Sequence, residues 1–305
     1  METRSISLFN ALLMIALIIF WGSSFVIVKI ALNEGMTPVS IATFRFLVAG
    51  LLFSVVLLFR TKRRNGYKHI DVKDLPKVLF LALSGVTFFF TAQYTGIQMA
   101  GAAIAAILVC FLAPILITIL STKILKEKLS RKQFLGIMMA AIGTLTVITG
   151  GTLSLQFDES ARTSFFFGSL ILFSTPFLWT AYSIYGKKIV ENYNPLLIVT
   201  YVTVLGAICL IPFSLFENSL QQVFILSINS WLAILYLSIT CSVIGYYIWF
   251  YVIEQVGAAI TSTFLFAEPL ITVLFAVMFV GEEVTFSLLM GGILIFTGVY
   301  LVTRK

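Results

Sequence analysis

The stretch GAAIAAILVCFLAP at residues 101–114 recurs as GAAITSTFLFAEP at residues 257–269. The two copies are followed by different charges. KILKEKLSRK, residues 123–132, carries five basic residues, whereas FVGEEVTFS, residues 279–287, carries two acidic residues and no basic one. The two apolar segments are therefore similar in sequence, whereas the segments that follow them differ in charge.

The repeat extends along the whole chain. Matching places in the two copies hold the same residue type at Gly101 and Gly257, Pro114 and Pro269, Glu127 and Glu282, Gly136 and Gly291, Gly143 and Gly298, and, farther upstream, Trp21 and Trp179. We interpret residues 1–150 and 160–305 as two copies of one unit, and we expect each unit to hold five membrane spans.

Composition indicates a polytopic membrane protein. Of the 305 residues, 60% are hydrophobic and 11% are charged, and the mean hydropathy is +1.05, which leaves too few polar side chains to cover a water-soluble domain. Apolar runs of about 20 residues, the length that one bilayer crossing needs, recur throughout. We predict an all-α integral membrane protein with ten spans, at residues 8–32, 38–59, 75–98, 101–121, 132–150, 165–189, 195–216, 230–253, 258–280 and 285–303.

The distribution of basic residues predicts which side of the membrane each loop faces. The basic residues cluster in residues 60–77, 123–132 and 187–188 and at both chain ends, which all lie on one side of the membrane if the termini are cytoplasmic. A unit with an odd number of spans enters and leaves on opposite sides, so the second copy is inverted. The loops after the second and fourth spans are therefore basic in the first copy, and their counterparts in the second copy are not. We expect a multi-pass protein of the cell membrane, in which the net charge of +7 faces membrane lipids and not nucleic acid.

The sequence lacks motifs for catalysis. It has no GxxxxGK[ST] phosphate loop and no HExxH pattern, and its loops are too short to hold a soluble catalytic domain, so we expect no enzyme activity. Cys110, Cys209 and Cys241 are dispersed among apolar residues. We interpret them as small hydrophobic residues and expect neither a metal nor a cofactor.

Glu268 is the strongest single candidate for a functional residue. It lies about ten residues into a predicted span, directly before Pro269, where a carboxylate costs a few kcal/mol unless it is neutral, paired or in a wet cavity. A substrate contact, a proton carrier that couples transport, and a structural partner of Arg45 or of hydroxyl groups are all open roles. Its counterpart in the first copy is Ala113, so the predicted site is asymmetric.

Polar and aromatic side chains within the spans predict the walls of a substrate cavity, because small-molecule pockets combine apolar walls with a few polar anchors. The candidates are Trp21, Ser24, Gln93, Tyr94, Gln98, Trp179, Tyr182, Tyr246, Trp249 and Glu268. Lys29 and Arg45 are candidates for ion pairs or structural contacts, and snorkelling to the interface explains either one. Pro114 and Pro269 are hinge candidates, with ordinary kinks as the alternative.

Small residues in the last span of each copy predict close packing of those helices. They are Gly136, Ala140 and Gly143 in the first copy and Gly291, Gly292 and Gly298 in the second.

Several of these residues form a pattern that covers the whole chain: Trp21, Gly22, Phe25, Lys29, Pro38, Arg45, Pro114, Glu127, Glu268, Pro269, Gly281, Glu282, and the glycines from Gly291 to Gly298. The pattern resembles the drug/metabolite transporter superfamily, EamA type. The resemblance implies a ten-helix transporter built from two inverted five-helix repeats, whose central cavity is lined mainly by the first, third, fourth, sixth, eighth and ninth helices. It also implies export of amino acids or related metabolites, with nucleotide sugars, sugars and drugs as substrates of neighbouring families.

We therefore expect a secondary transporter of small metabolites, an exporter of amino acids or related compounds, that works by alternating access between inverted repeats. The alternative is a ligand-binding membrane sensor or scaffold that has a transporter fold and does not translocate its ligand. A monomer is sufficient for either function, and a dimer is compatible with both.

Overall fold

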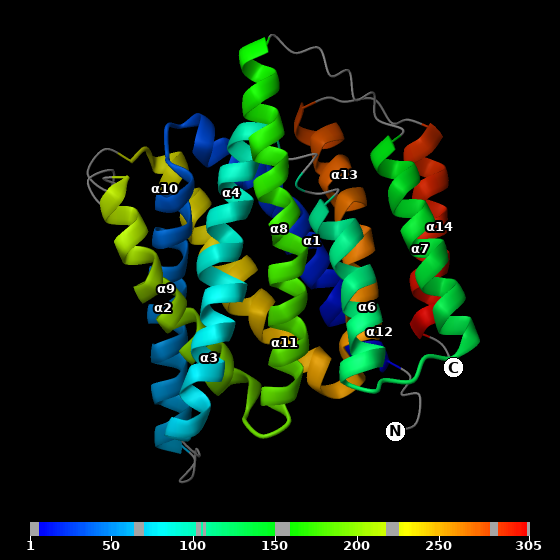
Figure 1. The fold of residues 1–305 in the computed structure, drawn as a ribbon, viewed down its shortest axis with the longest axis horizontal. Coiled ribbons are helices and arrows are strands. Elements are labelled where there is room, and N and C mark those ends of the chain that lie inside the picture. Colours follow the sequence, from blue (N-terminus) through cyan, green and yellow to red (C-terminus); the bar gives the residue numbers. More distant parts are fainter. Residues whose placement is uncertain are drawn as a thin grey trace.

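The computed structural model describes residues 6–63, 70–101, 105, 108–149, 159–217, 226–280 and 286–303. Over these residues the regular secondary structure is helical, and the helices stand side by side in one bundle (Figure 1). Apart from Gly101, the described part of every span range predicted from the sequence lies in helical structure. The all-α character of the prediction is therefore confirmed for the described residues.

The helical segments follow one another along the chain, with π-helical or 3-10 stretches inserted in several of them. They are α1 (Leu8–Asn33), α2 (Pro38–Arg63), η1 (Val72–Asp74), α3 (Leu75–Ala82), η2 (Leu83–Thr87), α4 (Phe88–Ala100), η3 (Leu108–Leu112), α6 (Ala113–Ile124), α7 (Arg131–Thr149), α8 (Glu159–Val190), α9 (Pro195–Phe216), α10 (Ile228–Tyr236), η5 (Leu237–Ile244), α11 (Gly245–Val256), α12 (Ala258–Thr263), η6 (Phe264–Ala267), α13 (Glu268–Val280) and α14 (Phe286–Thr303).

Seven of the described helical segments are long and apolar enough to cross a membrane. They are Leu8–Asn33, Pro38–Arg60, Val72–Ala100, Thr163–Val190, Pro195–Phe216, Ile228–Val256 and Ala258–Phe275. The segments Leu108–Ile124 and Leu289–Thr303 are shorter and also apolar. The chain is thus a helical protein with several membrane-crossing segments.

Local sequence signals set the helix ends. Ser7 and Ser227 cap α1 and α10, because each hydroxyl accepts a hydrogen bond from the backbone N–H three residues later, and Asn194 caps α9 in a similar way. Gly101 and Gly257 end α4 and α11 with φ values of 92° and 107°. Only glycine adopts such backbone readily, so two matching positions of the sequence repeat stop their helices by the same means.

Irregular helical stretches lie near the middle of the bundle. η2, η3 and η5 are π-helical and η6 is 3-10, and such stretches leave carbonyl groups that need other donors in an apolar medium. Side chains from other helices supply them. The Trp21 indole donates to the Cys241 carbonyl at 2.9 Å, and the Tyr246 hydroxyl donates to the Gly85 carbonyl at 3.0 Å.

The close packing predicted for the last span of each copy is present between α7 and α14, which lie side by side at one edge of the bundle (Figure 1). A Cβ added to Gly136 would lie 2.6 Å from the Gly298 carbonyl oxygen, and one added to Gly143 would lie 2.7 Å from that of Gly291. The two helices approach so closely that only glycine fits at these positions.

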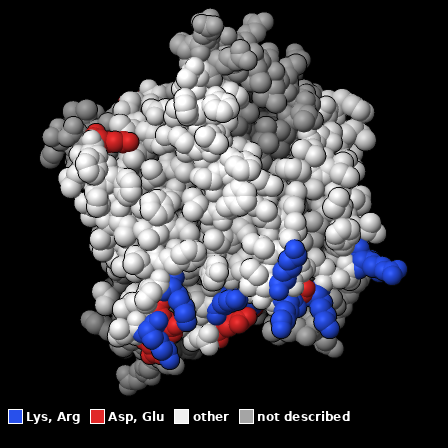
Figure 2. Space-filling model, viewed as in Figure 1, with Lys and Arg blue, Asp and Glu red and all other residues white. Residues whose placement is uncertain are grey.

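The surface has the distribution expected for a protein in lipid. Many large apolar side chains are exposed, among them Leu51, Phe59, Phe134, Phe166, Phe216 and Phe286. The described Lys and Arg side chains on the face shown in Figure 2 gather toward one end of the bundle, where α3 begins and α8 ends. The sides of the molecule are apolar, and one end is basic.

Candidate functional site

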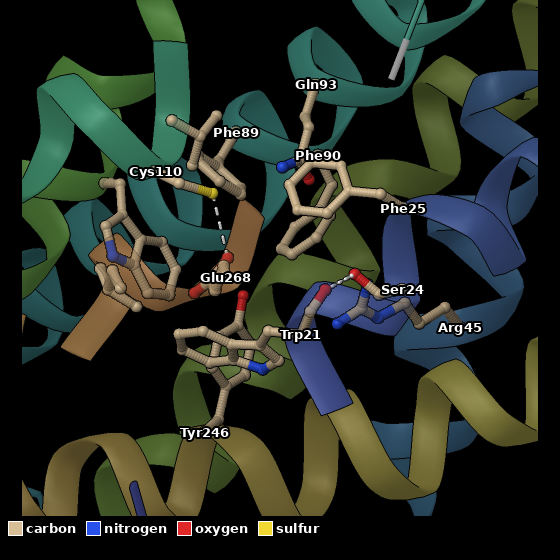
Figure 3. A pocket seen from close by; sticks show the side chains of 13 residues that line it. Trp21, Ser24, Phe25, Arg45, Phe89, Phe90, Gln93, Cys110, Tyr246 and Glu268 are labelled. Atoms are coloured by element: carbon tan, nitrogen blue, oxygen red, sulfur yellow. Dashed lines mark hydrogen bonds between the residues drawn. The ribbon is translucent and has the colours of Figure 1, made fainter. Parts of the chain in front are cut away.

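A small cavity lies at the centre of the bundle, and both Arg45 and Glu268 contribute to its lining. Its volume is about 40 Å³. The lining comes from helices far apart in the sequence: Trp21, Ser24, Phe25, Arg45, Phe89, Phe90, Gln93, Val109, Cys110, Trp179, Tyr246, Leu265 and Glu268 (Figure 3). Most of these side chains are aromatic or aliphatic, so the polar groups among them stand out.

Glu268 supplies the carboxylate. It is the first residue of α13, directly after the 3-10 turn η6, and its side chain is only 4% exposed. The Cys110 thiol donates a hydrogen bond to its Oε2 atom at 3.2 Å (Figure 3). Among the described residues, no Lys, Arg or His nitrogen lies within 4.0 Å of this carboxylate. The carboxylate is therefore buried in contact with a thiol and without a basic partner from the described chain.

Arg45 supplies the positive charge. Its Nε atom donates to the Ser242 hydroxyl at 2.7 Å, and one of its terminal nitrogens donates to the Tyr94 hydroxyl. The guanidinium carbon lies 4.5 Å from the centre of the Phe90 ring, a cation–π distance. No described carboxylate lies within 4.0 Å of it. Neutral groups thus hold the Arg45 side chain in place without neutralising its charge.

Four aromatic rings form a wall at one side of the cavity, with Trp21, Trp179 and Tyr246 lining it and Trp249 packed behind them. The ring centroid of Trp21 lies 5.3 Å from that of Trp179 and 5.5 Å from that of Trp249, and Trp179 stacks on Tyr246 at 6.0 Å. Because the four rings belong to α1, α8 and α11, the wall joins the two halves of the chain. The repeat partners Trp21 and Trp179 meet here edge to face, a favoured aromatic geometry.

Seven of the predicted site residues line the cavity: Trp21, Ser24, Arg45, Gln93, Trp179, Tyr246 and Glu268. Tyr94, Tyr182 and Trp249 are buried just behind it and do not line it. In the part of the chain that the structure describes, the Tyr182 hydroxyl and the Trp249 indole N–H are buried without a hydrogen-bond partner. Unpaired buried polar atoms are uncommon, and here both belong to rings that pack against Trp179.

The structure does not bring Gln98 or Lys29 to the cavity. Both side chains are exposed. Gln98 follows Gln93 by five residues, which is about 140° around an α-helix, so the two amides of α4 point in different directions. Lys29 lies near the end of α1 and forms no salt bridge with a described carboxylate. Gln98 therefore does not line the cavity in this conformation.

The proline positions coincide with changes of helix type. Pro114 is the second residue of α6, which follows the π-helical stretch η3, and Pro269 is the second residue of α13, which follows η6. Proline fits the first turn of a helix because its missing N–H needs no partner there. The two prolines therefore mark the joints next to the cavity.

Sequence reasoning missed Cys110, and it did not include Phe25, Phe89, Phe90, Val109 or Leu265 among the candidates. The interpretation of Cys110 as a small hydrophobic residue is incomplete, because its thiol contacts Glu268. The sequence repeat offered one signal. Cys110 lies in residues 101–114, and this stretch matches residues 257–269, which contain Glu268. Among the described residues, no group of His, Cys, Asp and Glu could hold a metal ion.

A bundle of apolar helices around a buried, polar and aromatic cavity defines a polytopic membrane protein with a small central cavity. The model of the EamA-like transporter family matches residues 8–149 and again residues 166–304. The chain belongs to this family, and it is a membrane transporter.

Similar proteins agree with this assignment. An "uncharacterized transporter" of Archaeoglobus fulgidus is 29% identical over 96% of this chain and 97% of its own length. The "uncharacterized transporter YyaM" of Bacillus subtilis is 31% identical over 92% of this chain and 89% of its own. A "probable amino-acid metabolite efflux pump" of Salmonella typhimurium is 25% identical over 96% of this chain and 94% of its own.

A solved structure titled "Crystal structure of protein" has the same fold. It superposes with a TM-score of 0.70 at 18% identity and covers 96% of this chain and 97% of its own.

Proposed function

We propose that this protein is a secondary transporter that exports zwitterionic amino acids or closely related metabolites by alternating access. The observation that carries the proposal is the presence of two buried, opposite charges in one cavity, Arg45 and Glu268, each without an oppositely charged partner among the described residues.

Buried charges of this kind favour a ligand that supplies the missing partners. A charged side chain within a membrane helix costs about 2.5–3.5 kcal/mol on insertion scales, and a partner on the ligand offsets part of that cost. A carboxylate on the ligand would pair with the Arg45 guanidinium, which matches its planar geometry. An ammonium group would pair with Glu268. A molecule that carries both groups is a zwitterion.

The remaining walls favour an apolar side chain on the ligand. Trp21, Phe89, Phe90, Trp179 and Tyr246 present rings to the cavity. The cavity volume of about 40 Å³ is far below the roughly 300–1,000 Å³ of small-molecule pockets. Entry of a metabolite therefore requires the aromatic side chains or their helices to move apart. This requirement fits a carrier that opens to one side at a time.

The architecture that supports alternating access is a pair of inverted five-helix repeats, residues 1–150 and 160–305, with ten membrane spans. The separate matches of the family model to 8–149 and 166–304 support it. The packing supports it as well, because several contacts between the halves have a counterpart in which the roles of the two halves are exchanged. The contact of α4 with α8 matches that of α11 with α1, α6 with α8 matches α13 with α1, η2 with α9 matches η5 with α2, and α3 with α9 matches α10 with α2. Such pairing is expected of two repeats related by a two-fold axis in the membrane plane.

The proposed orientation places both termini and the basic end of the bundle in the cytoplasm. α1 begins and α14 ends at this end of the bundle (Figures 1 and 2). A maleimide that cannot cross the membrane, applied to whole cells, is expected to label a Glu283→Cys variant and not a Lys128→Cys variant. The reverse labelling would contradict the orientation.

Glu268 is the coupling candidate, since it is the only described carboxylate in the cavity. A proton carrier there would bind and release a proton in each cycle, whereas a recognition carboxylate would remain bound to the substrate ammonium. Replacement by Gln distinguishes these roles. Loss of the pH dependence of transport with substrate exchange retained indicates the first role, and loss of exchange itself indicates the second.

The test of the proposed function is counterflow in proteoliposomes that contain the purified protein. Vesicles loaded with unlabelled amino acids are expected to accumulate labelled leucine or phenylalanine transiently. Deaminated and carboxyl-amidated analogues inside the vesicles should not support uptake, because each lacks one of the two charges. Arg45→Gln is expected to abolish the requirement for a substrate carboxylate, with Arg45→Lys as the matched control that retains a charge.

Two outcomes would count against this function. Counterflow supported equally by the analogues that lack one charge would contradict the zwitterion argument. Saturable binding of the amino acid without any counterflow would indicate the alternative, a membrane sensor or scaffold that has a transporter fold.

A further inference from the structure

A second hollow lies at the basic end of the molecule, away from the central cavity. It is a groove of about 660 Å³ between α3 and the end of α8, lined by Asp74, Pro76, Lys77, Phe80, Leu81, Tyr185, Lys188, Ile189, Asn192 and Tyr193. None of these residues lines the central cavity. We call it the α3–α8 groove. Its volume lies within the range of small-molecule sites, roughly 300–1,000 Å³.

The groove has a fixed order of polar and apolar groups. α3 leads away from the basic end and α8 returns to it (Figure 1). On α3, Phe80 follows Lys77 by three residues, and on α8, Lys188 follows Tyr185 by three. Because the two helices run in opposite directions, each places its lysine near the basic end and its aromatic ring one turn deeper. The Phe80 and Tyr185 rings meet edge to face at 5.2 Å, so they lie at one level.

The charges of the groove are not balanced. The only carboxylate of the lining belongs to Asp74, which accepts hydrogen bonds from Lys77 at 2.6 Å and from the Tyr193 hydroxyl at 2.8 Å. Lys188 lies 5.7 Å from the centre of the Tyr185 ring and has no described carboxylate within 4.0 Å. Nearby, Lys73 pairs with Asp71 and Lys187 with Glu191. Lys188 is therefore the positive charge left for an anion.

The depth of the aromatic rings distinguishes a lipid from a free anion. Phe80 is 44% exposed and Tyr185 is 49% exposed, and an inorganic anion would make no use of them. A phospholipid needs an anion-binding group at the membrane surface and an apolar surface below it. The α3–α8 groove offers both in that order, on the outer side of two adjacent membrane helices.

We propose that the α3–α8 groove binds one anionic phospholipid. The phosphate lies against Lys188 and the free N–H groups of Lys77, and an acyl chain lies along Phe80, Leu81 and Tyr185. The Asp74–Tyr193 hydrogen bond ties the start of α3 to the turn that follows α8 and so keeps the two walls together. This site is independent of the transported substrate.

The test is native mass spectrometry of the purified protein in a neutral detergent, titrated with dioleoyl-phosphatidylglycerol or dioleoyl-phosphatidylcholine. We expect one phosphatidylglycerol to bind at least tenfold more tightly than phosphatidylcholine. The Lys77→Gln/Lys188→Gln variant should bind phosphatidylglycerol about 25-fold more weakly and so lose that preference, since each basic group near a membrane surface contributes a factor of about five. Lys123→Gln, which removes an exposed lysine at the last turn of α6 outside the groove, is the matched control and should retain it.

Further variants distinguish a bound lipid from diffuse attraction and from a bound free anion. Lys188→Gln alone should lower the affinity severalfold and serves if the double variant does not fold. Phe80→Ala should weaken phosphatidylglycerol binding and should leave any binding of inorganic phosphate unchanged. The proposal is overturned if Lys123→Gln weakens binding as much as the groove variant does, because the attraction is then diffuse. It is also overturned if millimolar inorganic phosphate displaces the lipid, because the site then holds a free anion.

Discussion

The end of α11 and the end of α4 occupy matching places in the two halves, but their contacts differ. Lys187, on α8, is 9% exposed and donates a hydrogen bond to the Glu254 carbonyl near the end of α11 at 3.0 Å. Its counterpart Lys29, on α1, is exposed, and so is Gln98, the counterpart of Glu254 near the end of α4. The same lysine position is therefore engaged in the second half and free to reach solvent in the first.

A second contact joins the two halves nearby. The Glu127 carboxylate accepts hydrogen bonds from the backbone N–H groups of Ala258 and Ala259 at 2.8 and 3.0 Å, which caps α12 across the two halves. This contact and the Lys187 contact both lie at the basic end. Both contacts join helices of one half to helices of the other. In an inverted repeat, one conformation is asymmetric because exchange of the two halves gives the other state.

The largest expected effect concerns a cavity position where the halves differ in chemistry. Glu268→Ala gives the second half the residue that the first half has at Ala113. We expect counterflow to fall about 100-fold, since a hydrogen bond to a charged group contributes about 1.5–3 kcal/mol. Glu254→Gln is the control, because Glu254 is a carboxylate of the second half that does not line the cavity. Transport by Glu268→Ala at more than half the original rate would show that the carboxylate has no role in it.

The next prediction concerns a feature that the two halves share, the glycines at which α7 and α14 pack together. Gly143 in α7 and Gly298 in α14 are counterparts, and replacing either one by Ala should lower the free energy of unfolding by about 1–3 kcal/mol. The new Cβ at Gly143 would lie 2.7 Å from the Gly291 carbonyl oxygen, and the one at Gly298 would lie 2.5 Å from the Gly136 carbonyl oxygen. Gly292→Ala, whose Cβ would meet only the Leu270 side chain at 3.4 Å, is the control. Thermal unfolding in detergent provides the measurement. A large difference between the two counterparts would argue against a symmetric α7–α14 pair.

A smaller and unequal effect is expected for the two lysines. Lys187→Met removes the hydrogen bond to the Glu254 carbonyl and should lower the melting temperature by roughly 3–6 °C. Lys29→Met should leave it within about a degree, because Lys29 is exposed in this conformation. Melting temperatures measured side by side decide the matter. Equal shifts would contradict the assignment of Lys187 as the engaged member of the pair.

The smallest effect is local. Glu127→Gln weakens the cap on α12, and a charge at a helix N-terminus contributes about 1 kcal/mol. Hydrogen–deuterium exchange of a peptide that covers residues 257–263 should accelerate about fivefold, with the rest of the bundle unchanged. Glu191→Gln, another carboxylate at the basic end, is the control. Unchanged exchange in the Glu127→Gln variant would mean that the cap does not hold the two halves together.

Much of the fold could be predicted from the sequence, because a membrane helix can be recognised from the composition of its own segment. About 20 apolar residues are required to cross the bilayer, and the basic clusters between such runs are visible without any structure. The candidate site was predicted in part for a similar reason. Glu268 and Arg45 are costly inside an apolar segment, so each is conspicuous in the sequence alone.

Other parts of the site could not be predicted, because they depend on rotation and on contacts between distant helices. Gln93 and Gln98 look equivalent as polar residues in one span, yet only Gln93 faces the cavity. Helix periodicity separates them by angle, but it does not say which side faces inward when both sides of the helix are apolar. The irregular stretches η2, η3 and η5 also alter the local periodicity.

The amino-acid sequence was sufficient to predict the apolar helices, the charged residues within them and the repeat, because burial in lipid constrains each segment separately. The contact partners of these residues depend on the tertiary structure. It brought the Cys110 thiol to Glu268, 158 positions later in the chain, and the Ser242 hydroxyl to Arg45, 197 positions away. These pairings follow from how whole helices pack, and packing depends on every side chain between them.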